Sequence, residues 1–245
     1  MSDSLVINEI YLSLQGESTF AGLPCVFVRL TGCPLRCSWC DSAYAFAEGR
    51  RRPLSEVREE VHRLADPFPR PASEGGRLPL VELTGGEPLL QPAALPLLTA
   101  LCDDGFTVLL ETSGALDISG VDPRVRRIMD LKCPASGETA RNRWENLDAL
   151  QPTDEIKFVI ATREDYHWAR EQLARHRLDR ICPLLFSWAA PLSDAQRHPS
   201  LKSRPDGLTP ISRRELAEAI LADRLPVRFQ AQLHKLLWPP DQRGV

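Results

Sequence analysis

The sequence predicts an α/β fold in which a sheet of about six parallel strands curves into an incomplete (β/α) barrel. Short apolar runs, typical of strands buried on both faces, recur along the chain. Helical patterns separate many of these runs, and polar or glycine-rich stretches follow their carboxyl ends. Successive strand–helix units of this kind place their strands in one parallel sheet. With 245 residues, the chain is expected to form a single domain over 1–245, because α/β barrels of this size are commonly one unit.

The expected strands and helices follow one another along the whole chain. In order, the strands are 5–14, 25–30, 80–83, 107–110, 127–131, 155–160, 181–187 and 227–233. Helices are expected at 54–65, at 95–102, and after the capping-box patterns Thr162-x-x-Asp165 and Ser212-x-x-Glu215. Ser55 is the expected N-cap of the first helix. Residues 66–79, rich in Pro and Gly, and the polar segment 188–209 are expected to be loops.

The composition is that of an ordinary globular protein, with 43% hydrophobic residues, 26% charged residues and a net charge of -3. Because there is no basic excess, a nucleic-acid partner is not expected. No apolar run reaches the ~18 residues that a bilayer-spanning helix needs, and the amino terminus lacks the basic and apolar regions of a signal peptide. The sequence therefore predicts a cytoplasmic protein with no membrane partner.

Seven cysteines, an odd number, exclude a complete disulfide framework. Three of them, Cys33, Cys37 and Cys40, are spaced closely enough to converge on one metal centre. Two interpretations are open. A structural zinc site would need a fourth Cys or His at short spacing, and none follows Cys40 nearby. An iron–sulfur cubane held by three thiolates would instead leave one iron open to an outside ligand.

Polar residues in or after several strands are candidates for a ligand site, because the carboxyl ends of parallel strands meet at one edge of the sheet. Arg29, inside an apolar run, either forms a structural ion pair or holds a ligand carboxylate. The turn Gln15-Gly16-Glu17 and the run Thr84-Gly85-Gly86-Glu87-Pro88 let a polar ligand approach the backbone. His234 and Lys235, after the last expected strand, are by default a satisfied core histidine and a solvated charge.

The cysteine spacing, together with Thr84-Gly85-Gly86-Glu87-Pro88 one β/α unit later, resembles the motif pair of the radical S-adenosylmethionine superfamily. The resemblance implies a [4Fe–4S] cluster on Cys33, Cys37 and Cys40, whose open iron binds the amino and carboxylate groups of S-adenosylmethionine. It also places Trp39 beside the adenine.

Further motifs resemble one family of this superfamily, 7-carboxy-7-deazaguanine synthase. They are Leu14-Gln15-Gly16-Glu17, Arg29, Asp41-Ser42, Glu111-Thr112-Ser113-Gly114, Asp130-Leu131-Lys132-Cys133-Pro134 with Ser136, and Gln232-Leu233-His234-Lys235. The resemblance implies a homodimeric carbon–nitrogen lyase of queuosine and 7-deazapurine biosynthesis. That enzyme converts 6-carboxy-5,6,7,8-tetrahydropterin to 7-carboxy-7-deazaguanine with loss of ammonia, and it uses S-adenosylmethionine as a regenerated cofactor.

The same resemblance gives roles to individual residues. The implied catalytic residues are Cys33, Cys37, Cys40 and Arg29, with Arg29 on the substrate carboxylate. The implied substrate-binding residues are Leu14, Gln15, Gly16, Glu17, Arg29, Thr84 and His234. The implied S-adenosylmethionine-binding residues are Ser38, Trp39, Asp41, Gly86, Glu87, Lys132, Cys133, Pro134 and Ser136. Ser42 is the implied Mg2+ ligand, at a position where threonine is more usual.

The implied partners are the pterin, an electron donor such as flavodoxin, and a second copy of the chain. Amino-terminal and carboxy-terminal extensions are expected to close the substrate site. Two rival functions share parts of the pattern. Another radical enzyme with the same minimal barrel, such as a glycyl-radical activase, would not require Gln15, Arg29 and Ser42. A zinc-binding module would hold zinc without iron or sulfide.

Overall fold

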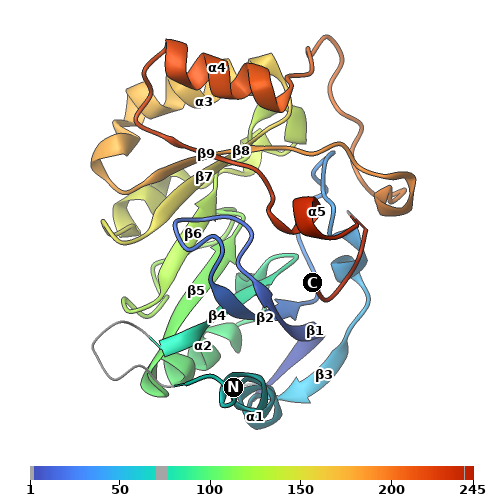
Figure 1. Cartoon of the computed structure of the whole chain (residues 1–245), viewed down its shortest axis with the longest axis vertical. Helices are drawn as coiled ribbons and strands as arrows, with labels where there is room; N and C mark the ends of the chain where they lie inside the picture. Colours follow the sequence, from blue (N-terminus) through green and yellow to red (C-terminus); the bar gives the residue numbers. More distant parts are fainter. Residues whose placement is uncertain (1–2, 70–76, 240) are drawn as a thin grey trace.

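The computed structural model describes residues 3–69, 77–239 and 241–245, and a nine-stranded sheet forms its centre. The strands are β1 (Ser4–Leu14), β2 (Pro24–Leu30), β3 (Arg50–Pro53), β4 (Arg77–Gly85), β5 (Phe106–Thr112), β6 (Arg126–Asp130), β7 (Glu155–Ile160), β8 (Leu184–Trp188) and β9 (Arg228–Gln230). Their spatial order is β3-β1-β2-β4-β5-β6-β7-β8-β9. Figure 1 shows this order running from β3 at one end of the molecule to β9 near the other.

The helices are α1 (Leu54–Ala65), α2 (Ala94–Asp103), α3 (Arg163–His176), α4 (Arg213–Ala222) and α5 (His234–Leu237). Short 3-10 turns connect them: η1 (Ala43–Phe46), η2 (Pro88–Leu90), η3 (Pro134–Ser136), η4 (Thr139–Arg141), η5 (Trp144–Ala149), η6 (Leu178–Arg180) and η7 (Asp194–Gln196). In the described part of the chain, no helix is both long and apolar enough to cross a membrane.

Strands β2, β4, β5, β6, β7, β8 and β9 pair in parallel, each with the next. Strand β1 is antiparallel to β2, and β3 is antiparallel to β1. Within the described residues, β3 and β9 are the two ends of the strand order and do not pair with each other. The prediction of an incomplete parallel α/β barrel is therefore confirmed, with antiparallel strands added at one end.

Two apolar clusters lie on the two faces of the sheet. The larger cluster packs the helices against the outer face, with Val57 of α1 and Leu98 of α2 fully buried. The smaller cluster, inside the curved sheet, consists of Cys25, Phe27, Leu80, Leu109, Ile128 and Leu185. Side chains alternate between the two faces of a strand, so the residues two positions after the members of this smaller cluster also point to the inner face. Those positions are polar in most strands, which leaves a polar chamber above a small apolar floor.

Several boundaries differ from the sequence-based expectation. Ser55 is not the N-cap of α1, which begins at Leu54 after Pro53, and the Leu54 N–H donates to the Asp3 carbonyl. Part of the loop expected at 66–79 belongs to β4 from Arg77 onward, and 70–76 lie outside the described residues.

The expected last strand, 227–233, is shorter than the pattern indicates. Strand β9 ends at Gln230, and the chain then turns into α5 because the Leu233 N–H donates to the Gly16 carbonyl instead of continuing the sheet. The capping boxes at Thr162 and Ser212 are both confirmed, with each hydroxyl accepting from the expected backbone N–H.

Candidate active site

A cavity of about 750 Å³ opens at the carboxyl ends of the parallel strands. Its walls come from the cysteine loop and from the inner faces of β2, β4, β5, β6 and β7. Residues from the segments 189–200, 232–235 and 241–245 complete it. The polar segment expected as a loop at 188–209 is a loop after Trp188, the last residue of β8, apart from the short turn η7, and part of it lines the cavity. Because all these strands point the same way, the topology gathers residues from distant parts of the sequence at one site.

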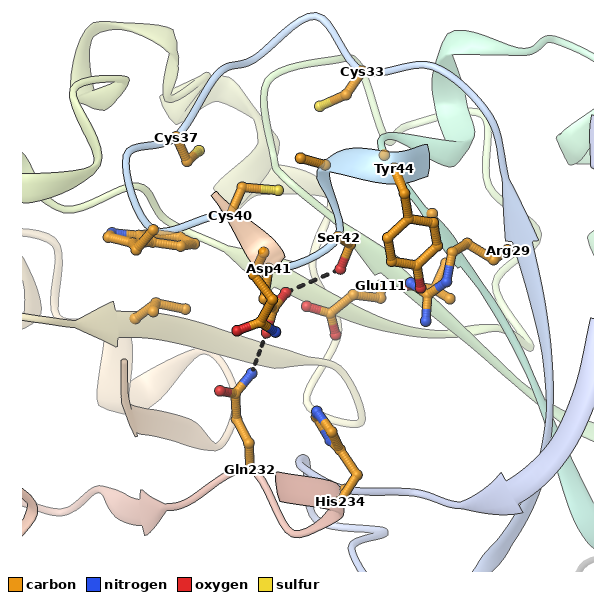
Figure 2. Close-up of a pocket in the computed structure, with 18 of the residues that line it drawn as sticks. Arg29, Cys33, Cys37, Cys40, Asp41, Ser42, Tyr44, Glu111, Gln232 and His234 are labelled. Carbon is orange, nitrogen blue, oxygen red and sulfur yellow. Dashed lines mark hydrogen bonds between the residues drawn. The ribbon is translucent and has the colours of Figure 1, made fainter. Parts of the chain in front are cut away.

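The cysteine loop connects β2 to η1 and lies along one side of this cavity. Cys33, Cys37 and Cys40 all line it, and all three are free thiols (Figure 2). Burial raises the pKa of Cys37 to about 11 and that of Cys40 to about 12. These thiols must therefore lose their protons when they bind a metal as thiolates.

Two contacts fix the cysteine loop to the turn that follows β6. The Ser38 N–H donates to the Ser136 carbonyl at 3.0 Å, and the Ser38 hydroxyl donates to the Ala135 carbonyl at 2.5 Å. On the other side, the Glu87 N–H donates to the Gly32 carbonyl at 2.8 Å. A Cβ on Gly86 would lie 2.2 Å from the Gly32 carbonyl oxygen. Only glycine at this position lets the loop after β4 lie so close to the start of the cysteine loop.

Lys132 connects the cysteine loop to the floor of the cavity. Its Nζ lies 2.7 Å from Asp130 Oδ2 and 5.1 Å from the centroid of the Trp39 ring. Lys132 and Asp130 are both buried at the end of β6, and both line the cavity. Within the described residues, Asp130 Oδ1 and Trp39 Nε1 are buried without a hydrogen-bond partner. Buried polar atoms normally have partners, so this part of the cavity is shaped for a polar ligand.

Asp41 ties the cysteine loop to the carboxy-terminal segment. Lys235 Nζ lies 2.6 Å from Asp41 Oδ2. The Gln232 amide donates to the same oxygen at 3.2 Å, and the Ser42 hydroxyl donates to Oδ1 at 3.0 Å (Figure 2). Burial alone would raise the pKa of Asp41, but Lys235 outweighs it and holds the pKa below its ordinary value. The Lys235 side chain is only 8% exposed, so the default interpretation of a solvated charge is wrong.

His234 follows Leu233 at the start of α5 and lies against the turn after β1. A Cβ on Gly16 would lie 3.0 Å from His234 Nδ1, so the small residue allows this approach. Both residues line the cavity. Burial lowers the pKa of His234, despite the opposing effect of Asp41 and Glu17. His234 therefore lies at the cavity wall, although it begins helix α5 instead of following directly on the last strand, as expected.

The far side of the cavity carries a network of polar and charged groups from the turn after β1 and from β4, β5 and β7. The Gln15 side-chain amide donates to Glu82, and Lys157 bonds with Glu111. Lys157 Nζ also lies 3.5 Å from Glu17 Oε2. Burial and mutual repulsion raise the pKa of Glu82 to about 8, and burial raises that of Glu111 to about 7. Near neutral pH, this pair of carboxyl groups therefore retains a proton.

Arg29 occupies the inner face of β2 next to this network. Its Nε lies 2.7 Å from Glu9 Oε1, and its Nη2 donates to the Tyr11 hydroxyl at 2.9 Å. Burial disfavours the charge, but Tyr11, Tyr44 and Glu9 outweigh it and raise the pKa of Arg29. A permanently charged guanidinium that faces a cavity is suited to a carboxylate ligand.

Comparison with known proteins identifies the family. A sequence model of the Radical SAM superfamily matches residues 27–136. The chain is 46% identical over 241 residues to the 7-carboxy-7-deazaguanine synthase of Koribacter versatilis, covering 98% of this chain and 99% of that one. The synthase of Chlorobaculum tepidum is 43% identical over 244 residues, covering 98% and 97% of the two chains. The chain belongs to the 7-carboxy-7-deazaguanine synthase family.

A solved structure agrees with the fold. The crystal structure of QueE from Escherichia coli matches this 7-carboxy-7-deazaguanine synthase family member with a TM-score of 0.67 at 23% identity, covering 94% of this chain and 95% of that one. Together with the match to the Radical SAM model, this fold confirms the radical SAM type of the incomplete barrel. Membership of the superfamily implies a [4Fe–4S] cluster and S-adenosylmethionine, so the iron–sulfur interpretation of the cysteine loop holds over zinc.

The residues present fit these groups. Three soft thiols line one cavity wall, and unpartnered polar atoms of Trp39 and Asp130 lie near Lys132 beside them. Among the described residues, no three His, Cys, Asp or Glu side chains form a ready site for a single metal ion. A cubane distributes its cysteine ligands over different iron atoms, so its ligands need not converge as closely as those of one ion.

Most residues to which the resemblance gave a role line the cavity. These are Leu14, Gln15, Gly16, Glu17, Arg29, Trp39, Asp41, Ser42, Thr84, Gly86, Lys132 and His234, together with the three cysteines. Five others, Ser38, Glu87, Cys133, Pro134 and Ser136, lie outside the lining. Glu87 is fully buried and accepts hydrogen bonds from Leu89, Thr112 and Ser113, so its carboxylate joins the loop after β4 to the end of β5.

The structure also adds residues that the motifs did not single out. Glu9, Tyr11 and Tyr44 surround Arg29, and Glu82 and Lys157 belong to the charged network. A signal for the last two was present: each is a charged residue in the middle of an apolar strand, as Arg29 is. Charged residues in such runs are rarely buried without a partner or a function.

Proposed function

We propose that this protein converts 6-carboxy-5,6,7,8-tetrahydropterin to 7-carboxy-7-deazaguanine with loss of ammonia, on the route to queuosine and other 7-deazapurines. One observation carries the proposal. A single cavity holds the three-cysteine loop on one side and Arg29 with a network of buried carboxyl and amide groups on the other. A flat, polar substrate with a carboxylate at one end matches that second side.

The cofactor side of the cavity would be held by the cysteine loop and its neighbours. When bound there, the cluster and S-adenosylmethionine supply a radical that takes a hydrogen atom from the substrate. Cys33, Cys37 and Cys40 would hold the cluster. Trp39, Asp41, Gly86 and Lys132 would contact S-adenosylmethionine from the cavity wall. Ser38, Glu87, Cys133, Pro134 and Ser136 would support that wall from behind through their loop contacts.

The substrate side would orient the pterin. Arg29 would bind the carboxylate, while Gln15, Glu17 and Thr84 offer donors and acceptors to the ring edge. Leu14, Gly16 and His234 would complete the wall next to the ring. Ser42, whose hydroxyl already lies against Asp41, would bind Mg2+ together with the substrate carboxylate, since Mg2+ prefers a few hard oxygen ligands.

The remaining features of the proposal concern the whole chain. Residues 1–245 would form one domain, in which the amino-terminal strand and the carboxy-terminal segment close the substrate side. The protein would act in the cytoplasm as a homodimer and would receive electrons from a small donor such as flavodoxin. The absence of a basic excess supports a small-molecule substrate over a nucleic acid.

The experiment is an anaerobic assay of the reconstituted protein with dithionite, S-adenosylmethionine, Mg2+ and 6-carboxytetrahydropterin. Product is followed by absorbance and mass. Formation of 7-carboxy-7-deazaguanine without depletion of S-adenosylmethionine supports the proposal. If 5′-deoxyadenosine accumulates and no deazaguanine forms, the radical chemistry stands and the substrate assignment fails.

A further inference from the structure

Glu9 lies directly opposite Arg29 where β1 and β2 pair in antiparallel register. The register shifts between Ile7 and Glu9, and this irregularity sets the pairing of the rest of the strand. Glu9 Oε1 accepts from Arg29 Nε at 2.7 Å, and the two side chains are only 19% and 13% exposed. The ion pair is therefore specific and largely shielded from water.

Tyr44 extends this pair to the cysteine loop. Its hydroxyl donates to the same Glu9 oxygen at 2.8 Å, and Tyr44 belongs to η1, four residues after Cys40. A chain of hydrogen bonds thus runs from η1 through Glu9 of β1 to Arg29 of β2. On the opposite side, Arg29 Nη2 donates to Tyr11. Among the described residues, Arg29 Nη1 has no hydrogen-bond partner, and Arg29 lines the cavity.

The Tyr44 ring is itself held in place. The Arg243 guanidinium lies 3.8 Å from the ring centroid and forms an ion pair with Glu48 at 2.7 Å. The Arg29 guanidinium lies 5.8 Å from the same centroid (Figure 2). A tyrosine that contacts two guanidinium groups and a carboxylate has little freedom to rotate.

We propose that Glu9 and Tyr44 are positioning residues that fix the guanidinium of Arg29 relative to the cysteine loop, so that Nη1 faces the substrate carboxylate. This inference rests on the proposed function, in which Arg29 binds that carboxylate. An arginine with a flexible stem needs such support, because a bidentate or end-on contact depends on the orientation of the planar group. The carboxylate is thereby held at a set place relative to the loop that carries Cys33, Cys37 and Cys40.

The test compares Tyr44→Phe and Glu9→Gln with the wild type in the reconstituted holoenzyme. Dissociation constants are measured for 6-carboxytetrahydropterin and for tetrahydropterin, which lacks the carboxylate. We expect each variant to lower the preference for the carboxylated ligand by about tenfold, as for one hydrogen bond to a charged group. KM for 6-carboxytetrahydropterin rises in parallel, while affinity for tetrahydropterin and the iron and sulfide content stay unchanged.

Tyr166→Phe and Glu60→Gln are the matched controls. The first control removes a hydroxyl that bonds with the carboxylate of Asp223, but Tyr166 does not line the cavity. The second removes the charge of Glu60, which pairs with Arg63 on the outer helix α1. If the wild type is active but the Tyr44→Phe and Glu9→Gln variants keep the preference for the carboxylated ligand, this inference fails and the proposed function stands. The same conclusion follows if the two variants bind both ligands more weakly by the same factor. A wild type that does not convert 6-carboxytetrahydropterin overturns the proposed function and this inference with it.

Discussion

Glu82 on β4 and Glu111 on β5 face the same cavity, in a network whose cation is Lys157. Lys157 bonds with Glu111, and Glu82 receives only the amide of Gln15 among the described residues. Lys157 is shared with Glu17 as well. The network therefore has more carboxyl groups than cations to neutralise them, and one proton near neutral pH reduces that excess.

This excess predicts how stability depends on pH. Folded Glu82 keeps its proton up to a pKa of about 8, whereas the ordinary pKa of a glutamate side chain is 4.5. The folded state is therefore favoured below pH 4.5, and this contribution is lost as the pH rises through 8. Glu82→Gln removes the titration, so we expect the free energy of unfolding of the wild type to fall relative to the variant, by on the order of 1–3 kcal/mol between these limits. Urea unfolding at a series of pH values measures the difference, and parallel curves would contradict the prediction.

Arg29→Ala tests the carboxylate site directly. We expect KM for 6-carboxytetrahydropterin to rise by ~10- to 100-fold, because a hydrogen bond to a charged group contributes ~1.5–3 kcal/mol. The iron and sulfide content should stay at the wild-type level, since Arg29 contacts Glu9 and Tyr11 and not the cysteines. Arg52→Ala on the outer strand β3 is the control, because its partner Glu56 is exposed. Unimpaired turnover by Arg29→Ala would favour a different radical enzyme.

Lys235→Met leaves Asp41 without its cation at the junction between the cysteine loop and α5. Asp41 is 25% exposed, so we expect a loss of about 1–3 kcal/mol in the free energy of unfolding at neutral pH, less than for a fully buried pair. In the wild type, the lowered pKa of Asp41 stabilises the fold at pH values above 3.8, the ordinary pKa of an aspartate side chain, and this stabilisation is lost as the pH falls below that value. The variant should lack most of that acid dependence.

The control for Lys235→Met is Arg214→Met, which breaks an exposed i,i+4 pair with Glu218 on α4. Exposed pairs of this kind contribute about 0.5 kcal/mol or less. Denaturant unfolding at pH 3 and pH 7 compares the two variants. Equal losses in the free energy of unfolding of the two variants would mean that the Lys235–Asp41 pair stabilises the fold no more than the exposed pair does.

Gly86→Ala tests the contact between the loop after β4 and the cysteine loop. The added Cβ would lie 2.2 Å from the Gly32 carbonyl oxygen and 2.7 Å from Cys33 Cβ, so the backbone must move. We expect a lower melting temperature and less iron retained after reconstitution. Gly120→Ala is the control, because its Cβ would meet only Leu95 Cδ1 at an ordinary 3.5 Å. A fully loaded Gly86→Ala protein would show that the close approach is not required.

The sequence predicted those parts of the fold that depend on local pattern. Strands such as 155–160 are short runs rich in apolar residues, and the capping boxes at Thr162 and Ser212 use residues three positions apart. The end of β9 was missed because it depends on a hydrogen bond from Leu233 to Gly16, which are far apart in the chain. The pairs Lys235–Asp41 and Tyr44–Glu9 are likewise products of the tertiary fold, and no periodicity in the sequence indicates them.

The motifs predicted which side chains line the cavity better than they predicted which side chains hold the surrounding loops in place. A resemblance identifies residues by type and position, so Cys33, Arg29 and Lys132 were found. Ser38 and Ser136 belong to the same motifs, yet their hydroxyls bond with backbone carbonyls outside the lining. The difference depends on rotamers and on the path of the backbone, which spacing alone does not determine.

The contact between Gly16 and His234 brings the first strand and the last helix to the same wall. During synthesis the cysteine loop therefore emerges long before the segments that enclose it: Ser136 follows it by about a hundred residues, and Lys235 by about two hundred. Contacts so distant in sequence form late, since closing long loops is slow. The thiols thus remain open to solvent in a growing chain, and a stable cluster is expected only after the last segment has folded into place.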